Sequence, residues 1–247
     1  MTMNIHLCFK SIFKCTTNLL KYFFIFFASL IFSIALQEKL AFNDDIGFSL
    51  ALLISTFFFL LALKIEKKKP IEFLRLRKVN FKLLPSLIFL SVIILLFEIG
   101  LGNLLHEIFT SPISDDMDLC FFSVLHILIL APICEEIFFR GIIFAKLKNI
   151  MPLSLAIFIQ AFLFGFLHGG LSGHIIQALI ITISGIVLGL VYHYTENLSM
   201  SISFHFINNF IVMILNILDF DINPIFCILI SILLLIIYIK WITSIKY

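Results

Sequence analysis

The sequence is poor in charged residues and in the residues that break helices. Only 13% of its 247 residues are charged, and it contains 10 Gly, 6 Pro and a single Trp. A soluble globular domain carries about 25% charged residues, so this composition excludes an ordinary soluble protein. The scarcity of Gly and Pro also excludes collagen-like and low-complexity disordered chains. The net charge of +2 gives no basic excess for nucleic-acid binding.

Apolar side chains are abundant instead. They make up 62% of the residues, 31 of which are Phe, and the mean hydropathy is +1.16. A membrane-spanning helix needs about 20 mostly apolar residues, and eight stretches come close to this length. They cover residues 19–36, 46–63, 83–105, 123–147, 151–168, 175–194, 198–218 and 225–242. We therefore predict an all-α polytopic membrane protein with about eight spans, in one membrane domain over residues 1–247.

The distribution of basic residues predicts how these spans are oriented. Lys and Arg accumulate on cytoplasmic loops. Sixteen of the 17 lie around the start of span one, after span two, at the end of span four or at the C-terminus, and only Lys39 lies elsewhere. The connections on the other side carry the acidic residues Glu38, Asp44, Asp45, Glu107, Asp115, Asp116, Asp118, Asp219 and Asp221. This bias predicts an even number of spans in the cell membrane and both termini in the cytoplasm.

Residues 1–18 permit two interpretations. They mix apolar and basic residues, so they form either an amphipathic helix on the cytoplasmic membrane surface or a disordered segment. No small-x-small cleavage site follows the first span, and we expect that span to be retained. The cysteines form no CxxC pair and no metal-binding spacing, so we expect them to be packing residues. They are Cys8, Cys15, Cys120, Cys134 and Cys227.

The fourth predicted span carries charges where they are costly. A charge at the bilayer centre costs about 2.5–3.5 kcal/mol on insertion scales, so such residues usually mark function. Glu136 and Arg140 are four residues apart, on one helix face and within reach of an ion pair. Glu135 points about 100° away from that face and is left free for chemistry. Pro132 should bend or loosen the helix just before the pair. The alternative is a charged cluster that only fixes helix packing.

Two later spans place a histidine four residues from a second side chain on the same helix face. In span five the pair is Phe164 and His168, and in span seven it is His205 and Asn209. Two strong hydrogen-bonding side chains in lipid must face a protein interior or a water-filled cavity. We therefore expect His205 and Asn209 to line a site. The alternative for His168 is a capped or interfacial residue at a helix end.

Other polar residues in the spans carry weaker signals. Glu98 stands alone in span three and is interpreted as a satisfied packing residue or a group that supports the site. Asn208 is interpreted as a packing or hydrogen-bonding residue, and His126 has no partner at helical spacing. Gly185 and Gly189 form a GxxxG pattern, which favours close helix packing.

Three short motifs occur in order along the chain. Glu-Glu-x-x-x-Arg at 135–140, Phe-x-x-x-His at 164–168 and His-x-x-x-Asn at 205–209 together resemble the CPBP family. This family, also called Abi, contains the second type of CAAX prenyl protease and bacteriocin-processing enzymes. The resemblance covers a core of about residues 119–218 and implies an eight-span intramembrane endopeptidase. It further implies a membrane-associated peptide or protein substrate, and a role in bacterial peptide maturation, pheromone signalling (quorum sensing) or bacteriocin processing and immunity.

The resemblance also implies a role for each motif residue. Glu135 would be the general base that activates a water molecule, and His168 would hold or polarise that water. Glu136 and Arg140 would orient the site. Glutamate and histidine can supply a base and hydrogen-bond donors without any Ser or Cys nucleophile.

His205 and Asn209 leave the question of a metal open. They would either stabilise the oxyanion or complete a Zn²⁺ shell with Glu135 and His168. A glutamate with two histidines is a common open zinc set, but HExxH is absent and Asn is an uncommon zinc ligand. A metal-free glutamate mechanism uses the same residues.

The directions of the spans raise a geometric difficulty. Counting along the spans puts His168 near the outer face, Glu135 near the middle of the membrane and His205 in the inner half. For these side chains to meet, span five must be tilted, shifted or broken at its glycines.

Two functions without proteolysis compete with this interpretation. A non-enzymatic membrane interaction or bacteriocin-immunity protein would use the same fold and would need no catalysis. A small transporter would use the Glu and His residues as a proton relay. No inverted repeat is evident between the two halves of the chain, which argues against the transporter.

Overall fold

The computed structural model describes residues 5–41, 44–109, 120–171, 173–218 and 222–245. Within these ranges the chain consists of helices and short connections, without any strand. The predicted all-α polytopic fold is thus confirmed. Some predicted features lie outside the described residues. They are residues 1–4 of the interfacial segment and the loop acids Asp115, Asp116, Asp118, Asp219 and Asp221.

The first part of the chain forms three long helices with a strap between the second and third. The elements are α1 (Ile5–Leu40), α2 (Asp44–Ile65), α3 (Pro70–Phe73), the 3₁₀ turn η1 (Phe81–Leu83) and α4 (Leu84–Phe109). From Ile5 onward, the predicted interfacial segment therefore belongs to the same helix as the first span.

The second part contains the motifs. Its elements are α5 (Phe121–Leu125), η2 (His126–Leu130), α6 (Ala131–Glu136), η3 (Ile137–Phe144), α7 (Ala145–Leu147), α8 (Leu153–Gly165), η4 (Phe166–Gly170), α9 (Ile175–Thr195), α10 (Leu198–Ile217) and α11 (Pro224–Ile245). The segments η2, η3 and η4 are π-helical. From α5 to α7 the helix continues without interruption, so Phe121–Leu147 is one rod with two widened stretches.

Seven of the eight predicted spans are helices long and apolar enough to cross a membrane. They are Thr16–Leu40, Ile46–Ile65, Phe81–Phe109, Leu153–Gly170, Ile175–Thr195, Leu198–Ile217 and Pro224–Thr243. The remaining prediction, 123–147, coincides with the rod from α5 to α7, which is long enough but carries the charged motif residues. The chain is therefore a multi-pass membrane protein, and its environment is a lipid bilayer.

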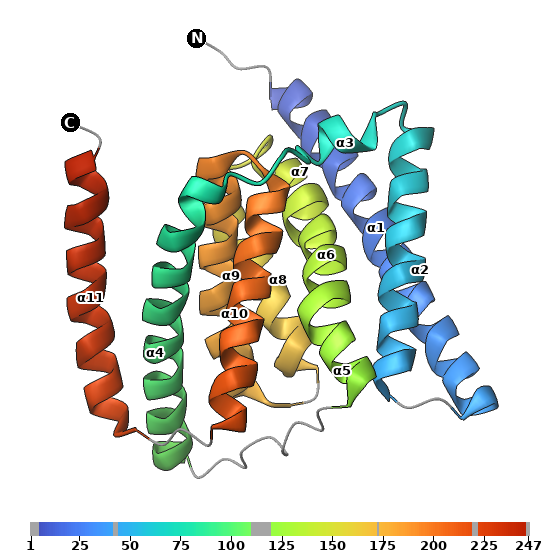
Figure 1. Ribbon diagram of the computed structural model, residues 1–247. Helices are drawn as coiled ribbons and strands as arrows, with labels where there is room; N and C mark the ends of the chain where they lie inside the picture. Colours follow the sequence, from blue (N-terminus) through green and yellow to red (C-terminus); the bar gives the residue numbers. More distant parts are fainter. Residues whose placement is uncertain (1–4, 42–43, 110–119, 172, 219–221, 246–247) are drawn as a thin grey trace.

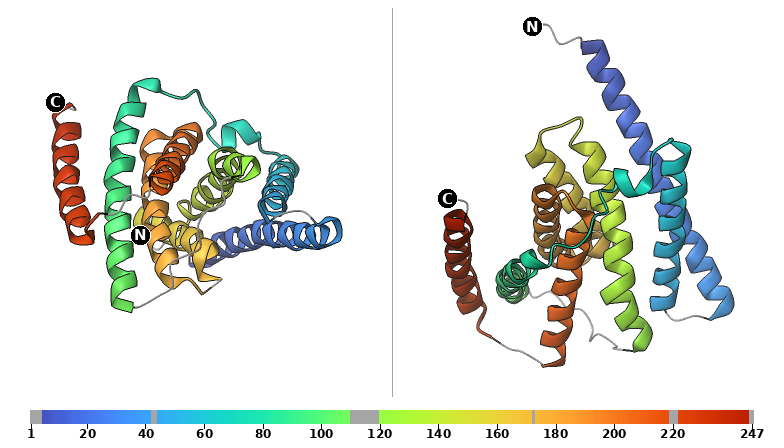
Figure 2. Two further views of the ribbon diagram at one scale, coloured as in Figure 1. Left: turned by 60° about the horizontal axis from the view of Figure 1, so that its bottom comes forward. Right: turned by 45° about the horizontal axis from the view of Figure 1, so that its top comes forward.

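The helices run side by side as a bundle (Figure 1). α1 and α2 pack together on one flank, and α4 and α11 pack together on the other. The rod from α5 to α7 lies between the flanks with α8, α9 and α10 (Figure 2). The described start of α1 and the described end of α11 lie at the same end of the bundle, which is also where α3 lies. Eight crossings would produce this arrangement.

The strap between α2 and α4 is tied to the bundle by two polar groups. Asn197, the N-cap of α10, accepts hydrogen bonds from the backbone N–H groups of Ser199 and Arg77 and donates one to the Lys78 carbonyl. Asn is a favoured N-cap because its side chain satisfies a free N–H of the first helical turn. The Asn197 side chain therefore holds the strap in place and also caps the first turn of α10.

Glu66 is the second tie, at the end of α2. Its carboxylate forms ion pairs with Lys21, Lys68 and Lys146, and the Tyr22 hydroxyl donates a hydrogen bond to it at 3.0 Å. Burial by itself would raise the pKa of Glu66. The three ammonium groups and the hydroxyl outweigh that effect and lower the pKa to about 2. Glu66 thus joins α1, the strap and α7 at the basic end of the bundle.

Candidate active site

Two adjacent glutamates on α6 have different surroundings. Glu136 is fully buried and saturated with hydrogen bonds. Its Oε1 accepts from Arg140 Nη1 at 2.6 Å and from His205 Nδ1 at 3.0 Å, and its Oε2 accepts from Ser201 Oγ at 2.6 Å. The predicted ion pair between Glu136 and Arg140 is therefore present. Glu136 is a carboxylate whose position is fixed by three partners.

Arg140 extends this network to α9. Its side chain is completely buried, and Nη2 donates to the Gly185 carbonyl at 3.1 Å. Gln160 donates to the same carbonyl at 2.8 Å. The guanidinium also lies over the ring of Phe164, with Cζ 4.5 Å from the ring centre. A buried charge is tolerated only when paired and hydrogen-bonded, so these contacts explain how Arg140 is accommodated.

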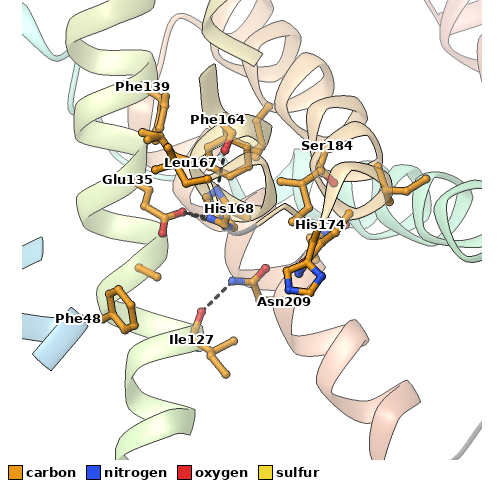
Figure 3. A pocket seen from close by; sticks show the side chains of 18 of the residues that line it. Phe48, Ile127, Glu135, Phe139, Phe164, Leu167, His168, His174, Ser184 and Asn209 are labelled. Atoms are coloured by element: carbon orange, nitrogen blue, oxygen red, sulfur yellow. Dashed lines mark hydrogen bonds and ion pairs between the residues drawn. The ribbon is translucent and has the colours of Figure 1, made fainter. Parts of the chain in front are cut away.

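Glu135 is the less constrained of the two glutamates. Its Oε2 is buried and has no hydrogen-bond partner among the described residues. Two imidazole nitrogens approach this oxygen: His168 Nε2 at 3.5 Å and His205 Nε2 at 3.9 Å. Figure 3 shows the Glu135 and His168 side chains turned toward each other at the cavity. One carboxylate oxygen, free of other partners, thus faces two histidines from different helices.

The ring orientation of both histidines is fixed by their other nitrogen. His168 Nδ1 lies 2.7 Å from the Phe164 carbonyl oxygen, and His205 Nδ1 lies 3.0 Å from Glu136 Oε1. A carbonyl and a carboxylate only accept hydrogen bonds, so in each ring Nδ1 carries the hydrogen. In a neutral ring, Nε2 then carries a lone pair that is directed toward Glu135. The site therefore gathers three proton acceptors around one point.

Asn209 closes the site on the side of the α5–α7 rod. Its Nδ2 donates to the Ile127 carbonyl at 2.8 Å, and the side chain lines the cavity (Figure 3). Ile127 lies in η2, the π-helical stretch that precedes Pro132. Because proline has no N–H and crowds the preceding turn, the backbone there departs from α-helix. The predicted loosening before the glutamates is therefore present as a π-helical stretch, a feature often found at functional sites.

The geometric difficulty in span five is resolved at its glycines. The helix does not break; it widens into η4, which carries His168 toward Glu135. A Cβ at Gly165 would lie 2.2 Å from the Ala178 carbonyl oxygen, and a Cβ at Gly169 would lie 2.8 Å from the His174 carbonyl oxygen. These glycines therefore allow the end of α8 and the start of α9 to approach closely.

The glycines of α9 serve the same contact. A Cβ at Gly185 would lie 2.9 Å from Ala161 Cα, and one at Gly189 would lie 2.6 Å from Gln160 Nε2. The close helix packing predicted from the GxxxG pattern is confirmed.

A cavity of about 990 Å³ lies beside these side chains. Residues from α1, α2, α4, η2, α6, η3, α8, η4, α9 and α10 line it, and most of them are apolar. Glu135, His168, His205 and Asn209 all line this cavity, whereas Glu136 and Arg140 do not. The structure thus divides the six predicted site residues into four that face the cavity and two that support them.

Some contacts were missed or misjudged from the sequence. His126 has a partner after all: its Nδ1 lies 2.9 Å from Ser49 Oγ, on α2, and no spacing within span four could show this. Ser201 was not predicted, although it stands four residues before His205 on the same helix face. Gln160 was likewise missed. Asn208 accepts a hydrogen bond from Ser91 at 2.9 Å, as its predicted hydrogen-bonding role requires.

Three of the residues predicted to bind zinc lie close together, since the Nε2 atoms of His168 and His205 are 3.5 and 3.9 Å from Glu135 Oε2. Among the described residues, no group of three or more His, Cys, Asp and Glu side chains is placed to hold a metal ion. Asn209, the fourth predicted ligand, donates from Nδ2 to the Ile127 carbonyl, whereas a metal would bind its Oδ1. Zn²⁺ itself stays a prediction, and we use no metal in the steps proposed below.

Comparison with known families agrees with the three motifs. Residues 118–211, from just before α5 to within α10, match the family model described as type II CAAX prenyl endopeptidase Rce1-like. No curated protein and no solved structure matches the chain. The matched segment includes all six predicted site residues, and the resemblance to CPBP proteases is confirmed. Over this segment, about two fifths of the chain, the protein is similar to the Rce1-like type II CAAX prenyl endopeptidases.

Proposed function

We propose that the chain hydrolyses a peptide bond with a water molecule activated by Glu135. The unpartnered Oε2 of Glu135, approached by two oriented imidazoles inside a cavity, is the observation that carries this proposal. A general base must be free to accept a proton and must lie within reach of the water it activates. Glu136 cannot serve, because Arg140, Ser201 and His205 occupy both of its oxygens.

In the first step a water molecule binds between Glu135 Oε2 and His168 Nε2. Glu135 takes a proton from the water as the oxygen attacks the scissile carbonyl carbon. The carbonyl oxygen then carries the negative charge of the tetrahedral intermediate. Donors that face this oxyanion stabilise it strongly in a water-poor site.

His205 is proposed as an oxyanion donor, together with Asn209. When both ring nitrogens of His205 carry a hydrogen, Nε2–H points into the cavity, and Nδ1–H stays hydrogen-bonded to Glu136 Oε1 at 3.0 Å. The fixed carboxylate of Glu136 thereby stabilises the imidazolium and keeps its orientation. Collapse of the intermediate breaks the C–N bond, and the proton held by Glu135 passes to the leaving nitrogen. The immediate products are a carboxylic acid and an amine, and the acid proton then passes to the amine or to solvent to leave a carboxylate.

The biological role proposed is maturation of a bacterial peptide, in pheromone signalling or in bacteriocin processing and immunity. We also propose that the protein lies in the cell membrane with both termini in the cytoplasm. The competing function is a membrane interaction or immunity protein that uses the fold without catalysis.

One experiment separates these two functions. Wild type and Glu135→Ala are expressed at matched membrane levels, and the small membrane-associated peptides of both strains are compared by mass spectrometry. We expect a precursor to accumulate only with Glu135→Ala. Identical peptide profiles together with an unchanged cellular phenotype in both strains would favour the non-enzymatic function.

A further inference from the structure

The cavity contains a second carboxylate that the proposed hydrolysis does not use. Glu98, on α4, lines the cavity with only 7% of its surface exposed. Ser184 Oγ, on α9, donates to Glu98 Oε1 at 2.7 Å. In Figure 3, Ser184 lies across the pocket from Glu135. Glu98 belongs to none of the three motifs and lies outside the matched segment 118–211.

Among the described residues, no cation is paired with Glu98. The described residues that line the cavity include two Glu and five His but neither Lys nor Arg. No ion pair within the described chain involves Glu98. The buried guanidinium of Arg140 is paired with Glu136 at 2.6 Å. A buried carboxylate without a cation is costly, and a bound cation would offset that cost.

The position of the cavity adds to its negative character. It is lined by the second half of α4, by η4 and the start of α9, and by the second half of α10. These segments lie toward the end of the bundle opposite the basic strap (Figure 1). The described helix ends there carry Glu38, Asp44 and Glu107 against a single basic residue, Lys39. A field of one sign attracts ligands of the other sign.

The size of the cavity gives a scale for the distance between Glu98 and the scissile bond. A sphere of the cavity's volume, about 990 Å³, would be about 12 Å across, and an extended chain advances about 3.3–3.6 Å per residue. A peptide that reaches both Glu98 and Glu135 therefore places the two contacted residues within about four positions of each other.

We propose that Glu98 determines substrate specificity by binding a Lys or Arg side chain of the peptide, within about four residues of the cleaved bond. This inference rests on the proposed function, since it concerns the substrate of the same site. Ser184 acts as a positioning residue that holds one oxygen of Glu98 and leaves the other for the cation. Conversely, a substrate with a free carboxylate next to the cleaved bond would lie beside Glu98 and Glu135, without a Lys or Arg among the described lining residues to pair with it.

The test uses the full chain in proteoliposomes and a peptide library read by mass spectrometry. A cleaved sequence with a basic residue is then synthesised in two forms, with that Lys retained or replaced by norleucine. The measured quantity is the ratio of kcat/KM for the two peptides. We expect a ratio of about 10 or more for wild type and a ratio near 1 for Glu98→Gln. Glu98→Lys should instead favour a peptide with Glu at that position.

Glu107→Gln is the matched control, because Glu107 lies on the same helix but is exposed and does not line the cavity. It should keep the wild-type ratio. Ser184→Ala should lower the ratio, and it serves as the second variant if Glu98→Gln does not fold.

The outcomes separate the inference from the function on which it rests. If wild type cleaves both peptides with a kcat/KM ratio near 1, the specificity role is overturned. The same holds if both Glu98→Gln and Ser184→Ala keep the wild-type ratio. Neither result affects the proposed protease function. If wild type cleaves no more peptide than Glu135→Gln does, the proposed function is overturned, and the inference with it.

Discussion

His205 contacts both adjacent glutamates through its two ring nitrogens. Nδ1 lies 3.0 Å from Glu136, and Nε2 lies 3.9 Å from Glu135. One imidazole therefore connects the fixed carboxylate to the free one. The two glutamates stand side by side in the sequence, yet Glu136 is held by three partners, and Glu135 is the residue that we propose as the base.

Replacing either glutamate by glutamine should show this separation. Glu135→Gln removes the proposed base but breaks no hydrogen bond to Oε2, so we expect cleavage to fall by about 10²–10⁴-fold with little change in melting temperature. Glu136→Gln leaves Arg140 buried without a counter-charge and should destabilise the fold by about 3–5 kcal/mol. Thermal unfolding in detergent and a peptide cleavage assay measure both effects. Equal destabilisation by the two variants would contradict the division of roles.

Adding one methyl group at Gly165 should displace His168. The new Cβ would lie 2.2 Å from the Ala178 carbonyl oxygen, so α8 and α9 must separate. We expect Gly165→Ala to cost about 1–3 kcal/mol of stability. Cleavage should fall by about 10²-fold, because a shift of about 1 Å is enough to misplace a catalytic group.

Gly102→Ala is the control for this substitution, because its Cβ would meet only Ile180 Cγ1, at 3.9 Å. It should leave the melting temperature unchanged or raise it slightly. If Gly165→Ala behaved like Gly102→Ala, the close contact of α8 with α9 would not position His168.

The Glu66 cluster should make stability depend on pH in the acid range. The pKa of Glu66 falls from 4.5 to about 2 in the folded state, so its contribution is fully present above about pH 5. That contribution is lost as the pH falls from about 5 to about 2. We expect the melting temperature of wild type to decline more steeply over this range than that of Glu66→Gln.

Glu72→Gln provides the comparison for Glu66, because Glu72 forms an exposed pair with Lys69 that should contribute little. Its decline with pH should follow that of wild type. A Glu66→Gln curve parallel to wild type would show that the cluster does not stabilise the fold.

Chelation tests the metal directly. A mechanism that uses side chains alone predicts that 1,10-phenanthroline leaves peptide cleavage unchanged. It also predicts far less than one zinc per chain by elemental analysis. Loss of cleavage on chelation, with recovery on adding Zn²⁺, would instead establish the zinc mechanism. In that case His205→Ala should lower the zinc content.

The orientation in the membrane is tested with single cysteines in a background without the native ones. Lys69→Cys, in the basic strap, should react with a membrane-impermeant maleimide only after the cells are opened. Glu107→Cys, on the exposed surface near the other end of α4, should react in intact cells. The reverse pattern would invert the proposed topology.

Much of the fold follows from apolar run length. Seven spans were predicted with ends within a few residues of the observed helices, because a bilayer imposes nearly the same length on every crossing. The pairing of Glu136 with Arg140 was also predictable, since spacing along one helix determines it. The predicted division between a paired and a free glutamate has the same local origin.

The contacts between helices were less predictable. The meeting of His168 with Glu135 depends on the π-helical stretch η4, and neither its place nor its effect on register is encoded by hydrophobic periodicity. The partnership of Glu98 with Ser184 joins residues 86 positions apart on two different helices. Spacing within one helix cannot reveal such a pair.

The charges of the α5–α7 rod have a consequence for how the protein is made. A helix with Glu135, Glu136 and Arg140 at its centre inserts into a bilayer with a penalty of about 2.5–3.5 kcal/mol for each unpaired charge. Arg140 lessens this penalty within the rod itself, but Ser201 and His205, the remaining partners of Glu136, are synthesised about 65 residues later. The ribosome therefore completes α10 only after the rod has left it. We therefore expect the rod to stay in contact with the translocon or with earlier helices until then, and its stable integration to be a late event of biogenesis.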